Sequence, residues 1–258
     1  MKKLICAVTL GVLVLGGHSA VWAKPAAKQV RKVRAPAAAA PAATAPAKAW
    51  DQAVTLTADG LPLIGSPAAP VKLIEYISYT CSHCAEFNAE AHDPLRSGMV
   101  RRGQVSVELR PYVRNELDML PSLLALCGTK EQYFANNDAL LAAQKTWFKE
   151  PADKSYQARW KALEQDKPAQ RLVVAKDLGL YTVMQARGFS VSAIEACLTN
   201  QAQADRLQAL TKQAAEKGGV IGTPSFVING QLQDIYGWTE LAPRLNAAIT
   251  AAAGSKAR

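Results

Sequence analysis

The stretch VKLIEYISYTCSHCAEF, residues 71–87, places Cys81 and Cys84 two residues apart with His83 between them. Paired thiols at this spacing can bind zinc, form a small structural disulfide or exchange electrons with other thiols. The residues before Cys81 resemble a buried strand, and helix formers follow it, with Thr80 as an N-cap candidate. We therefore expect the two cysteines at the start of a helix that follows a strand.

A cysteine at a helix N-terminus faces unpaired backbone N–H groups and the positive end of the helix dipole, which favour thiolate over thiol. We expect Cys81 to be the exposed nucleophile with a low pKa, and Cys84, one turn inward, to be the resolving cysteine. His83 could be a surface bystander. Its position between the cysteines favours an electrostatic role, as a donor or a positive charge near the Cys81 sulfur.

The other cysteines argue against a metal site. Zinc needs four ligands, commonly in two pairs, whereas Cys127 and Cys197 are solitary and lie in helical segments far apart in sequence. A disulfide across two residues would also constrain little of the unfolded chain. A redox dithiol is therefore the favoured interpretation, and it requires no metal or organic cofactor.

The N-terminus has the features of a cleavable signal peptide over residues 1–23, with a basic start, an apolar run and a small-residue cleavage site. Cleavage after Ala23 would leave Lys24 as the new N-terminus and remove Cys6 with the signal. The alternative is an uncleaved membrane anchor, because the apolar run is just long enough to span a bilayer. Export predicts a periplasmic location, where disulfides persist.

Residues 24–50 are rich in Ala and Pro, carry basic but no acidic side chains, and predict a flexible linker. The formal net charge is +9, yet all 21 acidic residues follow residue 50, so the part from 51 onward is close to neutral. Contact of the linker with anionic lipid or cell-wall polymer is the alternative to a solvated linker. No basic face interleaved with aromatic residues indicates nucleic-acid binding.

Residues 51–258 are expected to form one α/β domain with an inserted all-helical segment. The expected elements after the first strand and helix are a strand within 104–113, helices over about 116–200, a helix over about 203–216, a hairpin turning at Asn229-Gly230, and a C-terminal helix.

A second motif, Gly222-Thr223-Pro224, immediately precedes the apolar run SFVI. Together with GSPAAPVKLIEYISYTCSHC, GTPSFVING and the helical block between them, it resembles the DsbA-like periplasmic thiol:disulfide oxidoreductases of the thioredoxin superfamily over roughly residues 60–250. The resemblance implies a thioredoxin fold with an inserted all-helical domain. It also implies that Pro224 is cis and packs against the dithiol, and that Thr223 offers backbone groups to an extended client segment.

The same resemblance implies roles for three further residues. Glu75, six positions before Cys81, is expected to point into the core beneath the dithiol and to pass protons to Cys84; the alternative is an exposed acid on an edge strand. Cys127 and Cys197 are expected to form a second, non-catalytic disulfide, as in some family members; the alternative is two buried free thiols.

The resemblance further implies an oxidase of unfolded or reduced cysteine-containing proteins, itself reoxidised by a DsbB-like, quinone-linked membrane partner. We expect the protein to be a monomer. Two departures concern its redox behaviour: Ser82 precedes His83 where the best-known members have proline, and Thr223 stands where an aliphatic residue is common. Because threonine there also occurs in isomerase-type relatives, a disulfide isomerase or reductase is an alternative. Another is a non-catalytic chaperone that binds peptides in an apolar groove around Pro224.

Overall fold

The computed structural model describes residues 49–148 and 154–256, which belong to one compact unit. The expected signal peptide, residues 1–23, and the expected linker up to residue 48 lie outside the described residues. Within the described part, the helices are all too short or too polar to cross a membrane.

A six-stranded mixed sheet forms the centre of the described chain, in the order β1-β2-β4-β3-β5-β6. Its two middle strands, β3 and β4, are parallel, and every other neighbouring pair is antiparallel. The strands are β1 (Val54–Leu56), β2 (Pro62–Ile64), β3 (Val71–Ile77), β4 (Val105–Pro111), β5 (Ser225–Ile228) and β6 (Gln231–Gln233).

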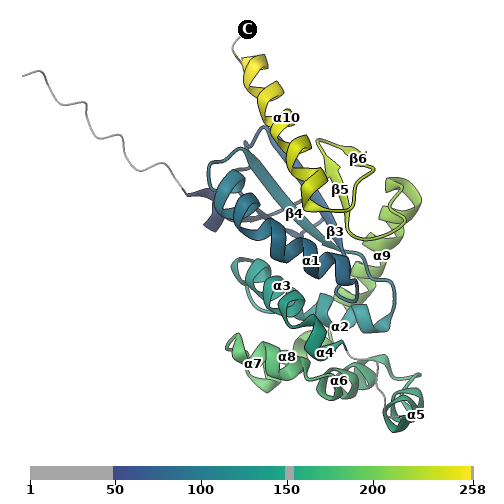
Figure 1. Cartoon of the computed structure of the whole chain (residues 1–258). Helices are drawn as coiled ribbons and strands as arrows, with labels where there is room; N and C mark the ends of the chain where they lie inside the picture. Colours follow the sequence, from purple (N-terminus) through teal and green to yellow (C-terminus); the bar gives the residue numbers. More distant parts are fainter. Residues whose placement is uncertain (1–48, 149–153, 257–258) are drawn as a thin grey trace, which may run out of the picture. The chain divides into compact units, whose positions relative to one another are not determined.

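Helices precede, connect and follow these strands (Figure 1). Before the sheet lies a short 3-10 helix, η1 (Trp50–Gln52). Between β3 and β4 lie α1 (Ser82–Ala91) and η2 (His92–Val100). Between β4 and β5 lie α2 (Glu116–Ala125), η3 (Lys130–Gln132), α3 (Tyr133–Ala142), α4 (Gln144–Trp147), α5 (Lys154–Ala162), α6 (Lys167–Asp177), α7 (Leu180–Ala186), α8 (Val191–Leu198) and α9 (Gln201–Gly218). The chain continues after β6 with α10 (Trp238–Lys256).

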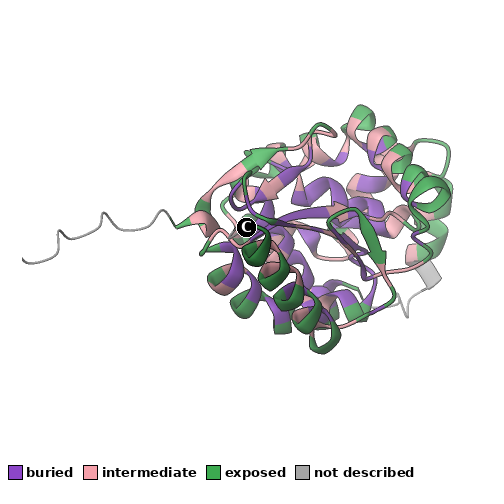
Figure 2. Ribbon diagram, turned by 90° about the horizontal axis from the view of Figure 1, so that it is seen from above, coloured by how far each residue is buried: buried purple, intermediate pink, exposed green. Residues whose placement is uncertain are grey.

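The two faces of β3 are buried against different helices. Successive side chains of a strand point to opposite faces. Leu73 and Ile77 belong to the core shared with α1 and α10, whereas Tyr76 packs with Ala214 of α9 and with Val220. In Figure 2 the central strands are buried and the outer surfaces of the helices are exposed. By this alternation Glu75, between Ile74 and Tyr76 in sequence, faces α1.

The predicted α/β fold with a helical insert is confirmed: the strand–helix–strand unit, the block α2–α8 and the final β5–β6–α10 unit follow one another as expected. The turn between β5 and β6 is also confirmed, because Asn229 and Gly230 have the positive φ values, 49° and 84°, that this tight turn requires. The β1–β2 hairpin and the π-helical geometry of η2 were not predicted from the sequence.

A disulfide links Cys127, just after α2, to Cys197 in α8. The bridged cysteines are 70 residues apart in sequence. In the chain-entropy model, closing a loop of this length stabilises the folded state by about 4 kcal/mol, less any strain. The bridge therefore ties the first and last helices of the insert together.

Candidate active site

The free cysteines lie at the start of α1, directly after β3. Cys81 is the N-cap residue, with extended backbone angles of φ −97° and ψ 118°, and the helix begins at Ser82. The expectation that Thr80 caps this helix is wrong. Its backbone N–H instead donates to the side chains of Asp118 and Ser78, because the loop before the helix is bonded to the protein interior.

Both cysteines of the dithiol, Cys81 and Cys84, are largely buried. Cys81 is 8% exposed and Cys84 is fully buried. Cys81 is therefore less accessible than expected from the sequence, although it remains the more accessible of the two. One of its contacts is with Thr223, because the Cys81 thiol donates a hydrogen bond to the Thr223 carbonyl oxygen at 3.2 Å.

Hydrogen-bond donors around Cys81 lower the pKa of its thiol from 9.0 to about 5. The largest contribution is the Cys84 thiol, which donates to the Cys81 thiolate. Partial burial opposes the shift, while the backbone N–H of Cys84, the Thr223 side chain and the backbone N–H of His83 add to it. The start of a helix thus stabilises negative charge on Cys81.

Cys84 is shifted in the opposite direction. Burial raises the pKa of its thiol well above the ordinary value, and the hydrogen bond to Cys81 and the negative charge of that residue raise it further. The backbone N–H of Ser78, 3.5 Å from the Cys84 sulfur, opposes the shift. Cys84 therefore keeps its proton at neutral pH when Cys81 has lost its own.

The Thr223–Pro224 segment is far from the dithiol in sequence but lies next to it in the structure. The peptide bond between the two residues is cis. Antiparallel pairing of β5 with β3 places Ser225 opposite Tyr76, near the end of β3 that leads to Cys81. The Thr223 hydroxyl is buried, has no hydrogen bond of normal geometry among the described residues, and lies near enough to both sulfurs to lower both pKa values.

His83 contributes through its backbone rather than its ring. Its imidazole is exposed and its Nδ1 atom lies 3.1 Å from a carboxylate oxygen of Glu86. The expected electrostatic effect of the ring on Cys81 is therefore replaced by the effect of the His83 backbone N–H. The reason is geometric, because the first turn of α1 directs this side chain along the outer surface of the helix.

Glu75 is buried under α1 on a central strand, which excludes an exposed acid on an edge strand. Burial raises the pKa of its carboxyl from 4.5 to about 8; the positive charge of Arg96 opposes this and the negative charge of Asp138 reinforces it. Phe87 and Asn88, one helical turn after Cys84, line the small cavity into which Glu75 opens. Glu75 thus lies about one turn of α1 away from Cys84.

Asp118, in the first turn of α2, organises the loop that leads to Cys81. Its fully buried carboxylate accepts hydrogen bonds from the Ser78 hydroxyl at 2.8 and 2.9 Å and from the Thr80 N–H at 3.0 Å. Arg114 adds its backbone N–H at 3.1 Å and also donates from its guanidinium to the Thr80 hydroxyl. Asp118 was not predicted from the sequence, in which its one signal is an acidic residue within the apolar run ELDMLPSLLA.

Gln144, at the start of α4, holds the same loop from the other side. Its buried side-chain amide donates to the backbone carbonyls of Tyr79 at 2.7 Å and Cys81 at 2.9 Å. A glutamine more than 60 positions from Cys81 carries no sequence pattern that could have identified it. The helical insert therefore supplies two buried anchors, Asp118 and Gln144, for the segment that carries the nucleophile.

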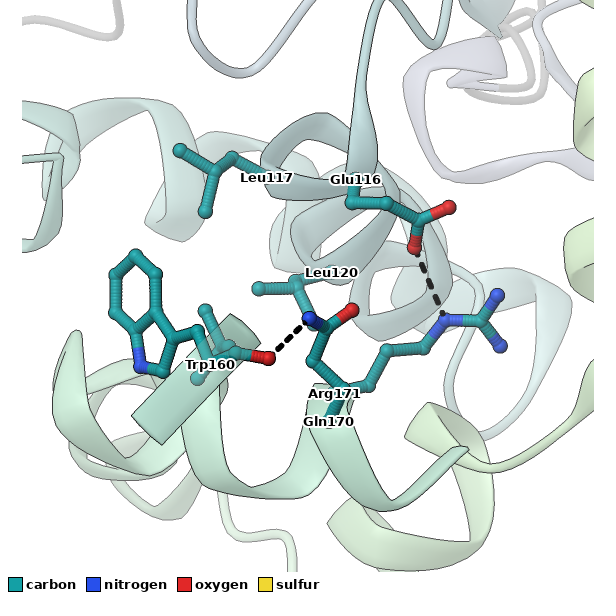
Figure 3. Close-up of a pocket in the computed structure, with 7 residues that line it drawn as sticks. Glu116, Leu117, Leu120, Trp160, Gln170 and Arg171 are labelled. Atoms are coloured by element: carbon teal, nitrogen blue, oxygen red, sulfur yellow. Dashed lines mark hydrogen bonds and ion pairs between the residues drawn. The ribbon is translucent and has the colours of Figure 1, made fainter. Parts of the chain in front are cut away.

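A separate cavity of about 190 Å³ lies within the helical insert (Figure 3). Its walls come from α2, α5 and α6 and are mainly apolar. Glu116 and Arg171 form an ion pair at 3.7 Å beside it, and the Gln170 side chain donates to the Trp160 carbonyl at 2.6 Å. Neither cysteine of the dithiol lines this cavity, so it is not the reaction site.

In the described part of the chain, no group of three or more His, Cys, Asp or Glu side chains is arranged to hold a metal ion. The sheet, its covering helices and the Cys-x-x-Cys pair at the start of α1 define a thioredoxin-fold protein. A family model described as Thioredoxin matches residues 57–244, and the chain belongs to this family.

Known proteins share this fold. The crystal structure of a protein-disulfide isomerase from Novosphingobium aromaticivorans is 34% identical, covers 72% of this chain and 96% of that one, and has a TM-score of 0.68. Wolbachia pipientis alpha-DsbA1 is 20% identical, with a TM-score of 0.58 and coverage of 78% of this chain and 96% of that one. The predicted thioredoxin fold with a helical insert is confirmed.

A Rickettsia typhi protein named "Putative protein-disulfide oxidoreductase" is 23% identical over 188 residues. The match spans 72% of this chain but only 61% of the length of that relative.

Replacing Gln144 tests the anchoring of the loop. Gln144→Leu should lower the free energy of unfolding by about 2–4 kcal/mol, because two carbonyls in a buried loop lose their donor. Gln170→Leu removes an amide that donates to one half-buried carbonyl and should lower it by about 1 kcal/mol. Urea unfolding of both variants measures the difference. Equal losses would contradict the anchoring role of Gln144.

The raised pKa of Glu75 predicts a pH-dependent stability. Between the unfolded pKa of 4.5 and the folded pKa of about 8, the folded state retains a proton that the unfolded state has lost, so stability falls as pH rises. Glu75→Gln removes this dependence. The stability of the variant relative to wild type should therefore increase by up to about 1.4 kcal/mol per pH unit across that range. Denaturant unfolding from pH 4.5 to 8 measures it, and a constant difference would contradict the assignment.

Proposed function

We propose that the protein is an exported thiol:disulfide oxidoreductase that introduces disulfides into other proteins. The observation that carries this proposal is the pair of opposite pKa shifts: Cys81 is acidic at a helix start, while Cys84 behind it is buried and retains its proton. Stabilising the reduced form of a dithiol in this way makes its disulfide a stronger oxidant of other thiols. The relatives named as disulfide isomerase or oxidoreductase support the same reaction class.

The reaction begins with the oxidised Cys81–Cys84 pair. A client thiolate attacks the Cys81 sulfur, the bond to Cys84 breaks, and Cys84 leaves with the electron pair and takes up a proton. Attack by a second client thiolate on the client sulfur of the mixed disulfide then releases Cys81 as a stabilised thiolate. The client gains a disulfide and the protein becomes a dithiol, so the two electrons and the sulfur bonds balance without a metal or organic cofactor.

Glu75 serves as the proton donor in the first step. Its carboxyl has a pKa of about 8 and so keeps its proton at neutral pH. Phe87 and Asn88, which line the cavity beside Glu75, lie one turn of α1 after Cys84. A carboxyl in this position would pass a proton to the Cys84 sulfur through an intervening water as the disulfide opens, and recover the proton afterwards. Pro224 and the Thr223 backbone lie beside Cys81, where they would guide an extended client segment.

Client proteins would dock on an apolar surface formed by residues before and after Pro224. Ile221 is 92% exposed, and Leu232 and Tyr236 are also exposed large apolar side chains. All three line a surface cavity of about 190 Å³ together with Ser225, the residue after Pro224. Such a surface suits the apolar segments that unfolded, reduced cysteine-containing proteins present.

The cellular setting is part of the same proposal. Residues 1–23 act as a signal peptide that is removed after Ala23. Residues 24–49 act as a linker to the catalytic domain in the periplasm, one residue shorter than expected because Trp50 begins η1. The mature protein works as a monomer, and a DsbB-like membrane partner that passes electrons to quinone restores its disulfide.

A disulfide isomerase or reductase is the second candidate, favoured by the likeness to the Novosphingobium protein-disulfide isomerase. A measured reduction potential separates the two. An oxidase with a stabilised Cys81 thiolate should have a potential near about −120 mV in glutathione redox buffers, whereas an isomerase should lie near about −180 mV and a reductase near about −270 mV.

The activity test mixes the oxidised protein with a reduced peptide that carries two cysteines. The wild type should form the peptide disulfide stoichiometrically, Cys81→Ser should form none, and Cys84→Ser should accumulate mixed disulfides when given an oxidised peptide. A wild type that leaves the peptide reduced, or a Cys81→Ser variant that is fully active, would reject the proposed function and favour a peptide-binding chaperone.

A further inference from the structure

A small cavity lies beside Glu75 beneath the far half of α1. Its volume is about 10 Å³, which is about the space that one water molecule needs. The polar residues that line it are Glu75, Asn88, His92 and Arg96. A buried water typically makes about three hydrogen bonds, and these four residues can supply them. The cavity thus suits a single water that contacts the Glu75 carboxyl.

A larger cavity of about 240 Å³ adjoins the same side chains. It is lined by Asp51, Phe134 and Asp138 among others, and it shares His92 and Arg96 with the small cavity. The imidazole of His92 is 44% exposed. His92 and Arg96 therefore stand between the space around the buried carboxyl and the solvent.

Of these two side chains, the imidazole is the one suited to carry protons. Arg96 is held by Asp138 at 2.5 Å, and a guanidinium does not lose its proton in proteins. Imidazole can gain and release a proton between pH 5 and 8. His92 also begins η2, and π-helical segments are frequently found at functional sites.

The charged surroundings are compatible with this role. Around Glu75 lie Arg96, Asp138, Tyr79 and Tyr133, of which only the first is cationic. His92 places Nδ1 3.0 Å from Asp93 and Nε2 3.6 Å from Asp138. The two remaining acids across the larger cavity are Asp51 and Glu131. The imidazole thus lies between carboxylates at the larger cavity, and His92 also lines the small cavity that Glu75 lines.

We propose that His92 transfers protons between solvent and Glu75 through one water in the small cavity. The inference rests on the proposed function, in which Glu75 donates a proton to Cys84 as the disulfide opens. The Glu75 carboxylate then takes a proton from the water, the water takes one from the His92 imidazolium, and the imidazole regains one from solvent. Reoxidation of the dithiol sends one proton outward along the same groups.

The test measures how fast a reduced dithiol peptide reduces the oxidised full-length protein. His92→Gln should slow this reaction by about tenfold at neutral pH, a smaller effect than loss of a direct acid because His92 acts through a water. Added imidazole, which the larger cavity can admit, should restore the rate. Glu90→Gln, which removes an exposed acid of α1, is the matched control and should react at the wild-type rate.

An equilibrium measurement separates proton transfer from a structural effect. A group that only carries protons changes the rate, so the equilibrium constant of His92→Gln with glutathione should equal that of the wild type. A wild-type rate in His92→Gln, a slow rate that imidazole does not restore, or a shifted equilibrium constant would each overturn the proposal. A wild type that does not react with the peptide would overturn the proposed function, and the inference with it.

Discussion

The stabilisation of negative charge on the Cys81 sulfur is the interaction on which the rest of the site depends. A thiol in water has a pKa near 8.5, and the donors at the start of α1 lower that of Cys81 to about 5. These donors act only at short range, so the sulfur, the first helical turn and Thr223 must keep fixed relative positions. The surrounding structure provides that rigidity from two sides.

One side is the helical insert, which acts as a support for the dithiol. Asp118 and Gln144 come from different helices of the insert, and both bond to the backbone between β3 and α1. The other side is the sheet, where β5 pairs with β3 and presents Thr223 to Cys81. Folding stability and thiol chemistry are therefore coupled, because loss of a buried anchor would also displace the groups that set the Cys81 pKa.

The features that the sequence predicts well are those with a local signature. The strand before Cys81, the turn at Asn229 and Gly230, and the order of helices and strands follow from periodicity and from turn chemistry. Thr80 illustrates the limit of local rules. Its side chain is a good N-cap by residue type, but the buried Asp118 recruits its backbone and leaves Cys81 at the cap.

Interactions between distant segments were not predictable in this way. Gln144 has no distinguishing neighbours in sequence, and its role depends on where the insert packs. The ring of His83 was expected to act on the Cys81 sulfur because His83 lies between the two cysteines in sequence. In the structure the ring contacts Glu86, one turn further along the helix. The π-helical geometry of η2, whose sequence HDPLRSGMV includes Pro94, was likewise not predicted, and its residues His92 and Arg96 line the small cavity beside Glu75.

The most direct test of the account is the pH titration of thiolate absorbance in the reduced protein, with Cys81→Ser as the reference. The account predicts that the first thiol of the wild type ionises with a pKa of about 5, and that this step is missing in the variant. The second thiol should ionise well above the ordinary cysteine range, since Cys84 is buried beside the Cys81 thiolate. A first ionisation near 8.5, as for a free cysteine, would contradict the account.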